Sequence, residues 1–134
     1  MKPGAADVSP FGIVRELLDE LAFTVAVRDL DAHVRCMSRR LRVFGVPGVE
    51  ALDYAGWLQR RSNELQKPLL YSLAYRDLAI HDADTQEITC SVREVMKGMQ
   101  GTVMMLDKDM TIVREQDGRW RVLSERIKGA SFKN

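Results

Sequence analysis

Thr102-Val103-Met104-Met105-Leu106 is followed by Thr111-Ile112-Val113-Arg114, then by the pair Asp117-Gly118 and by Arg119-Trp120-Arg121-Val122-Leu123. Asp-Gly between alternating apolar runs is the strongest short-range signal of a β-hairpin, because both central residues of a type I′ turn require a positive φ. The sequence therefore predicts that the chain ends in strands joined by a type I′ turn, with the helical segments placed before them.

The first helical segment has a clear start. Ser9 can cap it, and Pro10 suits the first helical position, where its missing N–H costs nothing. Apolar residues then recur at helical spacing opposite charged ones, which is typical of a helix packed on a core. This stripe comprises Phe11, Val14, Leu17, Leu18, Leu21 and Val25.

Two more helices are expected before the strands. Asp29 or Asp31 can cap a short second helix. A brief extended piece at 41–44 then leads to the turn cluster Gly-Val-Pro-Gly at 45–48, and a third helix is expected over about 49–65.

From Pro68 onward the apolar pattern has a period near two, which indicates strands. One strand is predicted from Tyr71 to about His81 and the next from about Gln86, with a turn or bulge between Gly98 and Gly101.

This order predicts one α+β domain over residues 1–134, with a core from about 10 to 127. Three N-terminal helices are expected to pack on one face of a curved, mostly antiparallel sheet.

Composition sets the class of protein. Hydrophobic residues make up 46% and charged residues 29% of the chain, and the formal net charge is +1. We therefore expect neither nucleic-acid binding nor attachment to an anionic membrane, and no apolar run approaches the length of a membrane span. Basic residues at 39–42 and 60–61 fit a solvated face better than an anion site.

The N-terminus, the cysteines and the histidines bear on the cellular location and on the cofactors that we expect. The N-terminal seven residues have no apolar core, so we expect no secretory signal, and Cys36 and Cys90 fit reduced thiols in a cytoplasmic protein. His33 and His81 form no metal-binding spacing, so the sequence predicts no metal and no cofactor.

The order of elements resembles the nuclear transport factor 2-like superfamily, which includes ketosteroid isomerase and polyketide cyclases. Arg28-Asp29-Leu30-Asp31-Ala32 resembles the junction between its first two helices, and Asp117-Gly118-Arg119-Trp120-Arg121-Val122 resembles its final strand. The resemblance covers roughly residues 10–127. It implies a cone-shaped mixed or antiparallel sheet with the helices on its concave face, a pocket between them, and dimers that pair through the sheet.

The catalytic residues of the isomerase are not matched. The resemblance places its general base near Gly45 and its oxyanion donors at Leu21 and Met110, with Asp109 one residue away. Glycine, leucine and methionine cannot exchange a useful proton, so we expect no isomerisation of a 3-oxo-Δ5 steroid. The pocket sets of limonene epoxide hydrolase and scytalone dehydratase cannot be placed either.

Asp77 and Glu94 are the candidates for catalysis. Asp77 continues the face of Tyr71 and Tyr75, and Glu94 continues that of Cys90. If these faces are concave, both carboxylates point toward the pocket, where burial raises a carboxyl pKa. The simpler interpretation places both near strand ends in water or beside arginines.

The sequence thus predicts a small dimeric domain whose pocket takes a small apolar ligand, without a clear catalytic constellation. One alternative is a lyase or isomerase, such as a dehydratase or cyclase, that uses a pocket carboxylate; another is an association module that pairs through its sheet. The expected ligand-binding residues are Tyr54, Trp57, Tyr71, Tyr75, Cys90 and Met104. The expected dimer face is the outer side of the sheet, with Leu70, Ala74, Val95, Val103, Met105 and Leu123.

Overall fold

The computed structural model describes residues 8–67 and 69–133. The expectations for the N-terminal seven residues and for Pro68 lie outside these ranges. The helices are α1 (Pro10–Ala26), α2 (Leu30–Val34), α3 (Tyr54–Gln66) and the 3₁₀ turn η1 (Met99–Gly101). The strands are β1 (Met37–Phe44), β2 (Leu52–Asp53), β3 (Ser72–Ala83), β4 (Glu87–Lys97), β5 (Val103–Arg114) and β6 (Trp120–Lys133).

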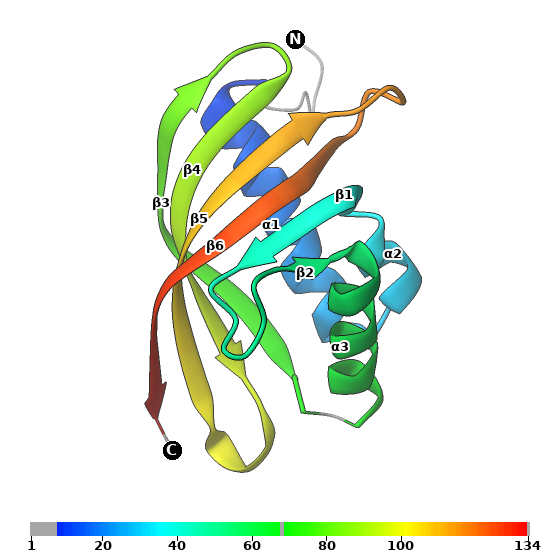
Figure 1. Ribbon diagram of the computed structural model, residues 1–134, viewed down its shortest axis with the longest axis vertical. Coiled ribbons are helices and arrows are strands. Elements are labelled where there is room, and N and C mark those ends of the chain that lie inside the picture. Colours follow the sequence, from blue (N-terminus) through cyan, green and yellow to red (C-terminus); the bar gives the residue numbers. More distant parts are fainter. Residues whose placement is uncertain (1–7, 68, 134) are drawn as a thin grey trace, which may run out of the picture.

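The strands form one curved sheet with the helices on a single face (Figure 1). The described residues give a six-stranded sheet in the order β2-β1-β6-β5-β4-β3. β1 runs parallel to β6 and the other neighbours are antiparallel, so the sheet is mixed. The predicted α+β class and arrangement are confirmed.

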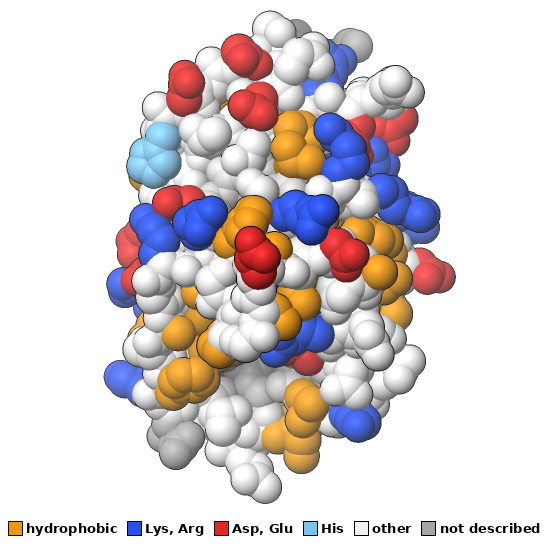
Figure 2. Space-filling view, viewed as in Figure 1, with side chains coloured by type: hydrophobic (Ala, Val, Ile, Leu, Met, Phe, Trp, Pro, Cys, Tyr) orange, Lys and Arg blue, Asp and Glu red, His pale blue; other side chains and the backbone are white. Residues whose placement is uncertain are grey.

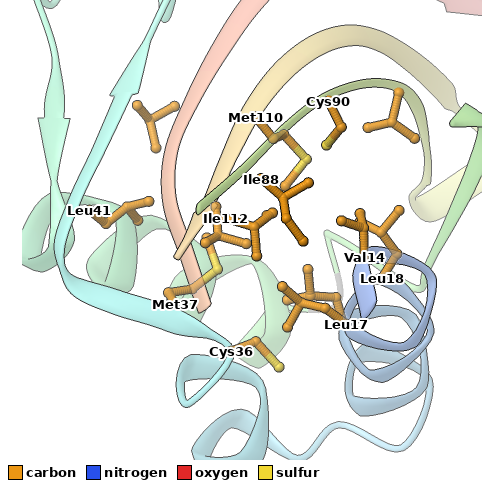
Figure 3. Close-up of a cluster of buried hydrophobic side chains, with 14 of the residues drawn as sticks. Val14, Leu17, Leu18, Cys36, Met37, Leu41, Ile88, Cys90, Met110 and Ile112 are labelled. Carbon is orange, nitrogen blue, oxygen red and sulfur yellow. The ribbon is translucent and has the colours of Figure 1, made fainter. Parts of the chain in front are cut away.

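The first helix begins as the sequence predicts. The Ser9 hydroxyl accepts a hydrogen bond from the Gly12 amide at 3.0 Å, and Pro10 is the first helical residue. The stripe faces the sheet except at Phe11, which is 49% exposed. Figure 3 shows side chains of α1 and of the sheet meeting in this core; they include Val14, Leu17, Leu18, Ile88, Cys90, Met110 and Ile112.

The second and third helices start at aspartates. Asp29 caps α2 by accepting from the Ala32 amide at 3.0 Å. The expected start of the third helix near residue 49 is wrong: Asp53 caps α3 by accepting from the Gly56 amide at 2.9 Å. Residues 52–53 also pair with β1, and this extended pairing holds the chain out of the helix until Tyr54.

The predicted hairpin is present, but its expected type I′ turn is wrong. Gly118 has φ of 83°, whereas Asp117 has no positive φ. The Gly118 amide donates to the carbonyl of Glu115 at 2.8 Å, and the Glu115 amide donates to that of Arg119 at 2.9 Å. The loop is therefore a tight turn followed by one glycine in the left-handed region, a common longer hairpin connection that needs only one positive φ.

The outer face of the sheet is more polar than the sequence predicted. Arg93 pairs with Asp107 at 2.9 Å, and Lys128 pairs with Asp109 at 2.9 Å. Figure 2, which looks onto the face turned away from α1, shows side chains of both charges gathered across its middle. Leu70 was expected on this face but is 2% exposed in the core, because it precedes β3 and strand alternation does not set its direction.

Candidate functional site

A cavity of about 300 Å³ opens between α3, the loop at residues 45–47 and the inner face of β4, β5 and β6. The loop closes over β6 at Gly45, which has φ of 87°. A Cβ at this position would collide with the backbone carbonyl oxygen of Ile127, so only glycine fits there. The position that the resemblance gives to a catalytic base therefore forms part of the cavity rim.

A buried ion cluster forms the floor of the cavity. The Lys108 ammonium lies 2.8 Å from Glu94 Oε1 and 2.8 Å from Glu125 Oε1. These three side chains are no more than 8% exposed. Each belongs to a different strand, β4, β5 or β6, and each points inward because strand alternation puts it on the face that α3 covers.

Tyr75 of β3 binds to this cluster through Glu94. Its hydroxyl donates a hydrogen bond of 2.8 Å to Glu94 Oε2, and the two residues are direct partners in the β3–β4 register. Burial and the neighbouring charge of Glu94 raise the pKa of Tyr75, so the hydroxyl keeps its proton and acts as a donor.

The charges of the cluster support one another. Burial opposes ionisation of Glu94, but Lys108 and Arg61 outweigh it and lower the pKa of this carboxyl. Burial likewise opposes the charge on Lys108, and Glu125 and Glu94 outweigh it and raise the pKa of the ammonium. Glu94 is therefore an ionised acceptor and Lys108 a protonated donor at neutral pH.

The wall contributed by α3 carries Arg61, which is held from three sides. Its Nε donates to Glu64 at 3.0 Å, its Nη1 donates to His33 Nε2 at 2.8 Å, and its guanidinium lies 5.5 Å from the Trp57 ring centre. Arginine only donates, so His33 Nε2 is the acceptor and Nδ1 carries the ring proton. Nδ1 donates to the Thr24 hydroxyl at 2.9 Å.

This arrangement keeps His33 neutral. Burial, followed by the positive charge of Arg61, lowers its pKa from 6.5 to about 3. A neutral imidazole with one donor and one acceptor matches Thr24 and Arg61, whereas an imidazolium would face a guanidinium. His33 therefore positions Arg61, which lines the cavity.

The remaining surface of the cavity is largely apolar. Trp57 closes the α3 side, and the rim includes Val46, Pro47 and Leu52. The strand side is formed by Met96, Met104, Leu106, Ile127, Ala130 and Phe132.

Three of the residues singled out from the sequence line this cavity: Glu94, Trp57 and Met104. Tyr75 reaches it through its hydrogen bond to Glu94. The other four, which are Tyr54, Tyr71, Cys90 and Asp77, do not line it. Tyr54 packs beside Trp57 and under Arg39, Tyr71 is 51% exposed beneath Arg28, and Cys90 is in the core against α1 (Figure 3).

Asp77 does not reach the cavity, contrary to the inward direction that alternation predicted. The β3–β4 register shifts between Arg76 and Ala79, and Asp77 has φ of 58° at this bulge. Its side chain is exposed and lies beside Ser91, Arg93 and other residues of a separate surface hollow. A bulge inserts a residue into one strand and so reverses the expected direction of its side chain.

The sequence argument missed Lys108 and Glu125. Its expectation of a solvated face at 60–61 is wrong for Arg61, which is 8% exposed because it packs on His33 and Trp57. His33 was considered only as a metal ligand. Lys108 could have been found, since Leu106, Lys108 and Met110 alternate along one strand and share the inner face. Glu125 was obscured by register shifts between β5 and β6. The positions given to the isomerase oxyanion donors, Leu21 and Met110, are each 3% exposed in the core.

Within residues 8–67 and 69–133, no group of histidine, cysteine, aspartate and glutamate side chains is arranged to hold a metal ion. In the same part of the chain, no helix is both long and apolar enough to cross a membrane.

Comparison with solved structures gives the same class of fold. A nuclear transport factor 2-like protein of unknown function from Shewanella oneidensis MR-1 has a TM-score of 0.74 at 15% identity, covering 89% of this chain and 98% of that chain. A candidate scytalone dehydratase from Novosphingobium aromaticivorans has a TM-score of 0.66 at 8% identity, covering 89% and 84%. A type 2 hexachlorocyclohexane dehydrochlorinase, LinA, has a TM-score of 0.59 at 10% identity, covering 91% and 87%.

These similarities establish a nuclear transport factor 2-like fold, and the predicted resemblance is confirmed at that level. No protein-family model and no curated protein matches the sequence. Fold alone does not carry activity, so function has to be argued from the cavity.

Proposed function

We propose that the protein binds a small, largely apolar molecule in the cavity between α3 and the sheet. The observation that carries this proposal is the cavity itself: about 300 Å³, apolar around its walls, with polar groups concentrated on the floor. Small-molecule sites have this composition, and this volume is at the lower end of their range.

Binding without turnover fits the floor better than catalysis does. A general base has to exchange a proton near the working pH, and the lowered pKa of Glu94 opposes this. Lys108 is fixed as an ammonium between two carboxylates, so it is not a nucleophile.

The neutral fluorophore N-phenyl-1-naphthylamine tests the proposal, since its emission rises in an apolar site. The chain has two tryptophans, and Trp57 lines the cavity whereas Trp120 does not. In a Trp120→Phe background, energy transfer to the bound probe therefore reports its proximity to Trp57. We expect saturable binding with such transfer.

A blocking variant locates the probe. Ala130→Phe fills the mouth and should weaken probe binding about tenfold or more, a loss of about 1.4 kcal/mol. Ser131→Phe is the matched control, because Ser131 is the next residue along β6 and does not line the cavity. No emission rise, or equal binding by the two variants, would refute the proposal.

We also propose that two copies pair through the outer face of the sheet, in the cytoplasm. Half-buried Val103, Met105 and Leu123 lie on this face beside exposed Ala74, and a partner would shield them.

Sedimentation velocity tests this pairing and should give twice 15.2 kDa at micromolar concentration. Met105→Lys should give single chains, and Thr85→Lys in the exposed β3–β4 turn should not. A wild-type chain that sediments at 15.2 kDa would refute pairing.

A lyase or isomerase is the second candidate, and one observation favours it: Tyr75, Glu94, Lys108 and Glu125 meet at the cavity floor. Two of the compared structures also carry names of elimination enzymes.

With the isomerase positions occupied by Gly45, Leu21 and Met110, we expect no isomerisation of a 3-oxo-Δ5 steroid. Ultraviolet absorbance of the conjugated product measures this, and turnover that disappears in Glu94→Gln would establish the enzyme.

A further inference from the structure

Arg61, on the wall that α3 contributes, offers the cavity a hydrogen-bond donor that the protein itself does not use. Nε of its guanidinium donates to Glu64, and Nη1 donates to His33. The remaining nitrogen, Nη2, donates to none of the described residues, and it is not one of their fully buried polar atoms without a partner. Nη2 therefore keeps accessible surface, and Arg61 lines the cavity.

This donor is held in place before a ligand arrives. Arg61 is only 8% exposed, and hydrogen bonds of 3.0 and 2.8 Å fix its guanidinium beside the Trp57 ring. His33, which is 0% exposed, is itself held by Thr24. A side chain that is already ordered loses little conformational freedom on binding, which favours affinity.

The chemistry of a guanidinium restricts the group that it can bind. A guanidinium has N–H groups and no acceptor, so the ligand has to supply an acceptor. A ligand ammonium has none, and it would also place a second cation beside Arg61.

The charges around the cavity favour a neutral acceptor over an anionic one. Glu64 already accepts from the same guanidinium, and Lys108 already lies between Glu94 and Glu125. All three glutamates line the cavity, so a ligand carboxylate would add a further negative charge among them. Like charges repel strongly where they are shielded from water.

We infer that the ligand carries a neutral carbonyl group, as in an aryl ketone, whose oxygen accepts a hydrogen bond from Arg61 Nη2. This inference rests on the proposed binding function and names the class of ligand for the same cavity. A carbonyl oxygen only accepts, so it leaves no proton that a second group would have to bind.

The walls suit an aromatic ring as the apolar part of this ligand. The Arg61 guanidinium lies 5.5 Å from the centre of the Trp57 ring, so a carbonyl group bound to it brings its substituents close to that ring. Met96 and Met104 line the strand side, and their sulfur atoms make favourable contacts with aromatic edges.

Three naphthalene compounds test this inference by isothermal titration calorimetry at neutral pH: 2-acetylnaphthalene, 2-isopropenylnaphthalene and 2-naphthoate. The first two have nearly the same shape, and the isopropenyl compound replaces the carbonyl oxygen by a methylene group. We expect the ketone to bind about fivefold to tenfold tighter than the isopropenyl compound, because a hydrogen bond from a charged donor strengthens binding. 2-Naphthoate should bind more weakly than the ketone.

A variant locates the preference. Arg61→Met removes the donor, and Glu64, whose side chain is 31% exposed, can then bind water instead. We expect this variant to bind the isopropenyl compound as the wild type does and to lose most of the preference for the ketone. Lys67→Met is the matched control, because it removes an exposed positive charge at the end of α3 that does not line the cavity, and it should keep that preference.

A second measurement on the wild type does not depend on a variant that folds. Hydrogen bonding withdraws electrons from a carbonyl carbon. The NMR signal of a labelled carbonyl carbon in 2-acetylnaphthalene should therefore lie further downfield in the complex than in an apolar solvent.

The outcomes separate the inference from the function on which it rests. If neither these compounds nor N-phenyl-1-naphthylamine bind, the proposed function fails. The function stands and the carbonyl inference is wrong if the ketone and the isopropenyl compound bind equally, if 2-naphthoate binds tightest, or if the carbonyl signal does not move downfield. A folded Arg61→Met variant that keeps the preference for the ketone would also overturn the inference.

Discussion

The two halves of the inner sheet face belong to the same strands but have opposite character. In one half, Ile88, Cys90, Met110 and Ile112 are at most 3% exposed and pack against α1 (Figure 3). In the other half, the same two strands present Glu94, Met96, Leu106 and Lys108 to a cavity. The change occurs within four residues along β4 and two along β5, without a break in their register.

The covering helix accounts for this difference. α1 supplies a stripe of buried apolar side chains, so a charge beneath it would have no partner. α3 instead places Arg61 and Glu64 over the sheet, so charged groups beneath it can be compensated. A shared strand face therefore does not by itself produce a uniform core.

The buried cluster should give the largest effect on stability. Lys108→Met leaves Glu94 and Glu125 facing each other without their cation, which should lower the free energy of unfolding by about 3–5 kcal/mol. Urea denaturation at neutral pH measures it. Lys128→Met removes an exposed ion pair with Asp109 and should cost less than about 1 kcal/mol.

A triple variant sharpens this test. Changing Glu94, Lys108 and Glu125 together to methionine removes every charge of the cluster, so it should recover most of the loss caused by Lys108→Met. Equal destabilisation by Lys108→Met and Lys128→Met would show that the cluster is not desolvated, and the contrast between the two halves would disappear.

Truncation of an apolar side chain should lower the free energy of unfolding more in the half under α1 than in the half at the cavity. This difference should be smaller than the effect of Lys108→Met. Ile112 is 0% exposed, and Ile112→Ala should cost about 3 kcal/mol because a closed void remains. Met104 is half-buried at the open cavity, and Met104→Ala should cost about 1 kcal/mol. Equal losses in urea denaturation would contradict an open cavity at Met104.

The sequence predicted most of the fold because local signals agreed with it. Ser9, Pro10 and Asp29 set the helix starts through caps that depend on a few neighbouring residues. The final hairpin was located by Asp117-Gly118, although the loop around it makes a different turn. The third helix was misplaced since its start depends on pairing between β1 and β2, which is not local.

The site was predicted less well, for two physical reasons. Alternation identified Glu94 as inward, but the bulge at Asp77 reversed a direction that alternation alone would extend. A lone Lys108 in a strand suggests a solvated residue, and its two carboxylate partners come from strands that meet only in the folded chain. The sequence also does not show that α3 leaves a cavity over its half of the sheet.

His33 lies between the two halves, and its titration provides the smallest effect. It stacks on Trp57, which belongs to the core cluster, and it accepts from Arg61, which lines the cavity. Its folded-state pKa of about 3 is below the ordinary 6.5. Between these values the unfolded chain binds a proton that the folded protein does not, so the free energy of unfolding decreases as pH falls.

The free energy of unfolding can change by up to about 1.4 kcal/mol per pH unit through one titrating group. We therefore expect it to decrease by about 1–2 kcal/mol between pH 6.5 and about 5. The lowered pKa of Glu94 adds its own loss only at lower pH, because its ordinary value is 4.5. Urea denaturation across this range measures the slope. His33→Gln keeps an acceptor for Arg61 and should flatten it, whereas His81→Gln, at an exposed position of β3, should not. If His33→Gln keeps the wild-type slope, His33 is not the neutral acceptor that joins the dry core to the cavity.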